Sequence, residues 1–141
     1  MEVGFVTTKA DIWALGCVIF RIITGTPLFA PECWGTTDEA NLEQIVGFVE
    51  RLGPVPDSLR TAWLDWDRHL TSDGLLKNPF PEDARELPLD QAIWEFKPNG
   101  MGEDELADFI AFMRLIFRFE PAERSSTEEL LQHRWVQERF L

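Results

Sequence analysis

The chain has 141 residues, of which 45% are hydrophobic and 27% charged, values that exclude a disordered or fibrous protein. Its 25 acidic and 13 basic residues give a net charge of −12, which argues against binding nucleic acid or an anionic membrane surface. An acidic surface suits a basic partner or serves solubility alone.

A nearly continuous apolar run predicts the first helix, over residues 8–24. Thr8 is the expected N-cap, and Asp11 three residues later completes an acidic variant of the capping box. Apolar side chains occupy almost every side of this helix, which is typical of a helix buried in a core. Gly25 followed by Pro27 ends it. The many β-branched residues leave a strand as the alternative.

The remaining elements are also predicted to be helical, so the fold class is all-α. Apolar residues at helical spacing predict amphipathic helices over residues 38–52 and 103–119, and a short helix is expected near 58–67. A capping box predicts a last helix over 126–133. Residues 70–100 hold four of the nine prolines and are predicted to form a long irregular insert.

Residue types alone reveal no active site. The two histidines, His69 and His133, lie far apart in the sequence, and neither has a partner at metal-ligand spacing. No glycine-rich phosphate-binding loop occurs. The sequence therefore predicts no catalytic, cofactor-binding or metal-binding residue. The two cysteines, Cys17 and Cys33, form no disulfide framework, which indicates an intracellular protein of the cytoplasm or nucleus.

Two stretches of the sequence resemble the eukaryotic protein kinase domain, and they occur in the same order as in that domain. The first is Asp11-Ile12-Trp13-Ala14-Leu15-Gly16-Cys17 followed by Leu28-Phe29, similar to the F helix of the large lobe. The second runs from Arg124 through Glu129-Leu130-Leu131 to His133 and Trp135, similar to the closing signature of that domain. Leu52-Gly53-Pro54-Val55-Pro56, followed by the long insert, resembles the SR-protein kinase branch. The resemblance covers essentially residues 1–141 and implies the C-terminal half of a large lobe, an incomplete domain.

The resemblance implies a serine/threonine kinase whose chemistry lies in other motifs. The family holds ATP and magnesium with a glycine-rich loop, a lysine, H-R-D and D-F-G, none of which occurs here, and no A-P-E precedes Asp11. We therefore expect this chain alone to be inactive. It is either a segment of an ATP-dependent protein kinase or a non-catalytic remnant that acts as a protein-interaction module.

The residues of this sequence that match functional positions of the family have structural roles there, not catalytic ones. The residue matching Asp11 holds the catalytic loop in the family, and the residue matching Arg124 pairs with the glutamate of A-P-E. Trp13 and Gly16 match positions that pack the F helix. Simple helix capping by Asp11 and a solvated surface position for Arg124 remain the alternatives.

The acidic helix carries the predicted partner site. Glu39, Glu43 and Glu50 fall within about 40° of one another on an ideal helix. In the SR-protein kinases the matching helix and the insert after it form an acidic groove that docks arginine-rich peptide, and the acids of that helix align best with Glu43 and Glu50. The expected partner is a basic Arg/Ser-rich protein segment or the missing front half of a kinase, and the alternative is a merely solvated face.

Overall fold

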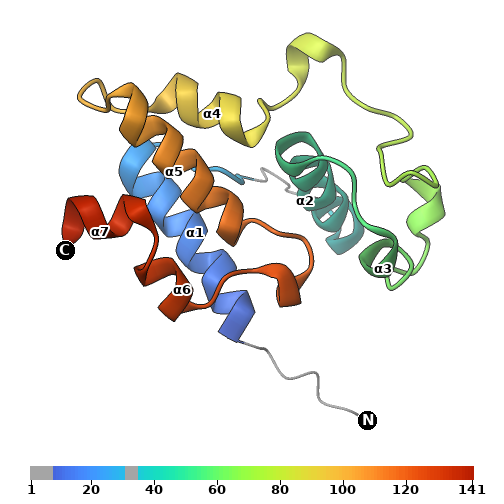
Figure 1. Ribbon diagram of the computed structural model, residues 1–141. Helices are drawn as coiled ribbons and strands as arrows, with labels where there is room; N and C mark the ends of the chain where they lie inside the picture. Colours follow the sequence, from blue (N-terminus) through green and yellow to red (C-terminus); the bar gives the residue numbers. More distant parts are fainter. Residues whose placement is uncertain (1–7, 31–34) are drawn as a thin grey trace. The chain divides into compact units, whose positions relative to one another are not determined.

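The computed structural model describes residues 8–30 and 35–141, and the predicted all-α class is confirmed (Figure 1). No strand occurs within these ranges, where one isolated bridge pairs Leu70 with Leu76. Contacts divide the described residues into two compact units: residues 8–28 with 93–141, and residues 29–30 with 35–92. Over the part that the structure describes, no helix is long and apolar enough to cross a membrane.

In the first unit, α1 (Thr8–Thr24) runs beside α5 (Glu103–Ile116) (Figure 1). The buried face of α1 consists of Ile12, Gly16 and Phe20, which repeat every four residues. At Gly16 the two helices come so close that an added Cβ would lie 2.4 Å from Cγ2 of Ile116. Glycine is therefore the residue that this approach requires.

The expectation that α1 is buried on every side is wrong for this chain. Leu15, Val18 and Ile22 are 40%, 54% and 73% exposed, because packing covers only one face of the helix. The helix does end as predicted: Gly25 has φ +76°, and its N–H donates to the carbonyl of Arg21 at 2.9 Å. The helix begins at Thr8, at the edge of the described residues, so the capping role of Thr8 stays a prediction.

The C-terminal helices differ from their predicted limits. Helix α5 ends at Ile116 instead of 119, because Phe117 leaves helical geometry and packs its ring against Trp13. The predicted helix over 126–133 is the shorter α6 (Thr127–Leu131), capped by Ser126. It is followed by α7 (Arg134–Phe140), which the sequence did not predict because its cap is a histidine. Nδ1 of His133 accepts the N–H of Trp135 at 3.1 Å.

In the second unit, α2 (Thr37–Leu52) opens on a capping box between Thr36 and Glu39 and ends at Gly53, whose φ is +94°. The short helix expected near 58–67 is wrong as one element. The segment instead forms α3 (Asp57–Arg60) and the 3₁₀ turn η1 (Trp66–Arg68). Arg60, the last residue of α3, is buried, 2.5 Å from the carboxylate of Asp57 and with its guanidinium 4.5 Å from the centre of the Trp66 ring.

The prediction of an irregular insert over residues 70–100 is wrong for two parts of it. A 3₁₀ turn, η2 (Glu82–Ala84), and a helix, α4 (Leu89–Phe96), interrupt the segment. The helix forms because the prolines flank it without entering it, and proline is tolerated at a helix start. Its buried residues, Leu89, Ala92 and Ile93, repeat at helical spacing.

Candidate functional site

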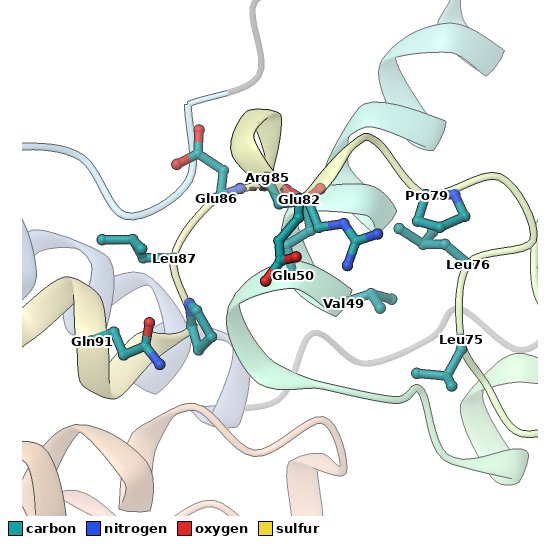
Figure 2. A pocket seen from close by; sticks show the side chains of 11 residues that line it. Val49, Glu50, Leu75, Leu76, Pro79, Glu82, Arg85, Glu86, Leu87 and Gln91 are labelled. Carbon is teal, nitrogen blue, oxygen red and sulfur yellow. Dashed lines mark hydrogen bonds between the residues drawn. The ribbon is translucent and has the colours of Figure 1, made fainter.

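A pocket of about 620 Å³ opens in the second unit, beside the C-terminal end of α2 (Figure 2). Three chain segments form it: the end of α2, the loop before η2, and the stretch that leads from η2 into α4. Three of its side chains are carboxylates, one is a guanidinium, and most others are apolar. The lining residues are Val49, Glu50, Leu75, Leu76, Pro79, Glu82, Arg85, Glu86, Leu87, Pro88 and Gln91.

Arg51 connects α2 to the pocket wall formed by residues 86 and 87. Its Nη1 donates to the carbonyl of Leu87 at 2.7 Å, and its Nη2 pairs with Oε2 of Glu86 at 2.9 Å. The Arg51 side chain is 7% exposed, whereas that of Glu86 is 62% exposed. Burial lowers the pKa of the Arg51 guanidinium, and the carboxylates of Glu86 and Glu50 oppose that shift. These bonds hold the 86–87 backbone against a residue 35 positions earlier.

Glu50 lines the pocket and, among the described residues, has one carboxylate oxygen without a hydrogen-bond donor. Its Oε2 accepts the backbone N–H of Glu86 at 3.1 Å, which fixes the carboxylate at the pocket wall. Its other oxygen, Oε1, is buried and has no hydrogen-bond donor within the described parts of the chain. A buried acceptor without a donor is unfavourable by about 1–3 kcal/mol, so this oxygen favours any ligand that brings an N–H group.

The other acids of α2 lie in different surroundings. Glu43, the second predicted docking residue, is exposed and is not part of the pocket wall. Glu39 accepts the N–H of Thr36 at 2.7 Å and so completes the capping box. Of the two predicted docking residues, the structure thus brings Glu50 into the pocket and leaves Glu43 outside it.

The four predicted structural residues lie in the first unit. Asp11 is exposed in the first turn of α1, and Gly16 is buried against α5. The Trp13 ring meets the Phe117 ring edge-on, with ring centres 5.1 Å apart. The guanidinium of Arg124 also lies over the Trp13 ring, 4.8 Å from its centre.

Arg124 follows the 3₁₀ turn η3 (Pro121–Glu123) and is held by backbone carbonyls. Its guanidinium donates to Lys9 at 2.9 Å, to Arg118 at 2.8 Å and to Phe119 at 3.2 Å. In return, the ammonium of Lys9 donates to the carbonyl of Arg124. Partial burial lowers the pKa of Arg124. The geometry disfavours the alternative of a solvated surface arginine, because the side chain joins the start of α1 to the C-terminal segment.

Metal chemistry finds no support in the described ranges. No group of three or more His, Cys, Asp or Glu side chains in them is arranged to hold a metal ion. The ring of His69 stacks on Trp63 with centres 5.6 Å apart, and His133 caps α7. The contacts of both histidines thus stabilise the fold.

Sequence reasoning missed the pocket residues Glu82, Arg85 and Glu86. They lie in the segment predicted to be irregular, more than thirty positions after Glu50, and no periodicity connects them to α2. The one available signal was local: an acid at 82, 83 and 86 beside Arg85, next to the prolines of the insert.

Comparison with known proteins assigns the chain to a family. The family model described as "Protein kinase domain" matches residues 3–136. The chain is 30% identical over 131 residues to the serine/threonine-protein kinase SKY1 of Saccharomyces cerevisiae, covering 92% of the chain and 17% of that protein. It is 24% identical over 129 residues to the serine/threonine-protein kinase SRPK of Physarum polycephalum (92% and 29%) and 30% identical over 136 residues to AFC2 of Arabidopsis thaliana (87% and 28%). The chain spans less than a third of the length of these relatives.

Proposed function

The chain belongs to the protein kinase domain family, and from that premise we propose that it serves a serine/threonine kinase as the part of the large lobe that docks arginine-rich protein segments. In a complete domain of this family, ATP and magnesium support phosphoryl transfer to a hydroxyl group. The motifs that hold them are absent from this sequence, so the role proposed for its own residues is docking. Protein kinases are typically intracellular, and the proposal places the chain in the cytoplasm or the nucleus. The docking role also suits a non-catalytic member of the family.

The observation that carries the proposal is the buried Oε1 of Glu50, which lacks a donor among the described residues. A guanidinium would supply that donor and a positive charge together, and charge-assisted hydrogen bonds are about twice as strong as neutral ones. The apolar wall, which includes Val49, Leu75 and Pro79, suits the methylene stem that an arginine buries. A lysine would offer a point charge without the planar pair of donors.

Glu43 is proposed as a second, exposed contact on the same helix. It lies seven residues before Glu50, which corresponds to about 10.5 Å along an ideal helix. A peptide with several arginines can therefore reach both carboxylates. Glu43 is exposed, so its contribution is small and sensitive to salt.

The test is binding of a fluorescein-labelled peptide of four Arg-Ser repeats to the purified chain, followed by fluorescence anisotropy. We expect saturable binding that weakens as salt rises, and weaker binding of a Lys-Ser peptide of equal length. Glu50→Gln should weaken Arg-Ser binding about tenfold, the loss of one hydrogen bond to a charged group. Glu43→Gln should weaken it about twofold.

A charge-matched control separates docking from net attraction. The double variant Glu43→Gln/Glu50→Gln removes two negative charges, and Glu128→Gln/Glu138→Gln removes two exposed ones in the other unit. The first pair should weaken binding by at least about fivefold more than the second. Equal losses would mean that the −12 net charge alone attracts the peptide, and the docking proposal would be refuted.

A further inference from the structure

Among the described residues, Arg85 is the one cation that lines the pocket (Figure 2). It directly follows η2 and is exposed. Its Nε donates to the carbonyl of Phe80 at 2.6 Å, which braces the turn between them. This is the one hydrogen bond that its guanidinium makes within the described chain. The Nη groups thus remain available to the carboxylates around the pocket.

The charges around the pocket nearly cancel. Three carboxylates, Glu50, Glu82 and Glu86, line it, and Arg51 behind the wall pairs with Glu86 at 2.9 Å. Counting both arginines, three negative and two positive charges leave a net charge of −1. Without Arg85 the same site would carry −2, so this residue halves the charge that an incoming cation meets.

We infer that Arg85 determines the specificity of the pocket by competing with an incoming guanidinium for the carboxylates of Glu50 and Glu82. The inference rests on the proposed docking function. Arg85 keeps affinity for a single arginine low, because that ligand must displace or approach a like charge. A segment with several arginines gains additional contacts outside the pocket, Glu43 among them, and overcomes the competition. The pocket thereby selects arginine-dense segments over isolated arginines.

The competing role and a purely structural role of Arg85 predict different changes in peptide affinity when Arg85 is replaced. If Arg85 only braced the turn at Phe80, its replacement would weaken binding or leave it unchanged. If it competes, Arg85→Gln should tighten binding of the Arg-Ser peptide by about two- to fivefold at low salt, the range of an exposed charge interaction. The gain should be larger for a peptide with a single arginine, and it should shrink at high salt. Arg85→Lys retains the charge and should bind as the unmodified chain does, within about twofold.

Arg68→Gln is the matched control, since Arg68 is exposed in the same unit and does not line the pocket. Tightening by Arg85→Gln, without equal tightening by Arg68→Gln, supports the inference. Weaker or unchanged binding by Arg85→Gln, or an equal gain in Arg68→Gln, overturns it. If at the same time Glu50→Gln still weakens binding about tenfold, the docking proposal stands and the competing role alone fails. Absence of peptide binding by the unmodified chain overturns both.

Discussion

Adding one methyl group at Gly16 tests the contact between α1 and α5. A Cβ built on this residue lies 2.4 Å from Cγ2 of Ile116 and 2.8 Å from Cζ of Phe117, distances that real Cβ atoms essentially never show. Neither neighbour can move aside freely. Ile116 is 0% exposed, and the Phe117 ring is held edge-on against Trp13.

Overpacking of this kind costs about 1–3 kcal/mol, whereas alanine favours a helix over glycine by about 1 kcal/mol. We therefore expect Gly16→Ala to lower the free energy of unfolding by about 1 kcal/mol, measured by urea titration with far-UV circular dichroism. Gly47→Ala is the control, because Gly47 lies within α2 and its added Cβ would come no closer than 3.9 Å to Cδ1 of Phe29. That variant should gain about 0.5–1 kcal/mol. Equal gains in both variants would refute the close packing of α1 on α5.

Two further predictions concern the same unit. Arg124→Lys should lower the free energy of unfolding by about 1–2 kcal/mol in the same titration. Three different guanidinium nitrogens reach the three carbonyls, and the planar group stacks on Trp13, whereas an ammonium has its donors on one nitrogen and no plane to stack. An unchanged unfolding midpoint would contradict this geometry. Burial raises the pKa of the Cys17 thiol, so at pH 8 less of it is thiolate, the reactive form, than in an exposed cysteine. In a Cys33→Ser variant, Cys17 of the folded protein should react with a disulfide reagent at least about tenfold more slowly than Cys17 of the protein unfolded in urea. The rate in the folded protein should still rise above about pH 8.5. Equal rates in the two states would show that the thiol is accessible and its pKa unshifted.

The family and the fold class could be predicted because their signals are local. Helix α1 coincides with the predicted range 8–24, since its apolar run and its Gly25 stop lie within one stretch of sequence. The kinase resemblance rested on two short signatures, and the comparisons confirm it. Helix α4 escaped prediction because prolines dominate its surroundings in the sequence, although none lies within Leu89–Phe96. Helix α7 escaped it because a ring nitrogen of His133 replaces the usual hydroxyl or carboxylate cap.

The pocket could be predicted only from its α2 side. The resemblance to the SR-protein kinases pointed to Glu43 and Glu50, of which only Glu50 lines the pocket. The opposite wall depends on tertiary bonds between Arg51 and residues 86 and 87. Such bonds leave no periodicity in the sequence, because one side is an irregular backbone segment. Arg85, which changes the charge of the site, therefore became visible only in the folded chain.

The acidic stripe of α2 shows why helical geometry alone does not define a site. Glu39, Glu43 and Glu50 share one side of the helix, yet Glu39 closes the capping box, Glu43 is exposed, and Glu50 lines the pocket and has a buried oxygen. Salt distinguishes these environments, since screening weakens interactions of exposed charges far more than those of buried groups. The loss caused by Glu43→Gln should therefore vanish at high salt, whereas the loss caused by Glu50→Gln should persist. A loss at Glu50 that disappears together with the one at Glu43 would mean that its buried oxygen does not contact the peptide.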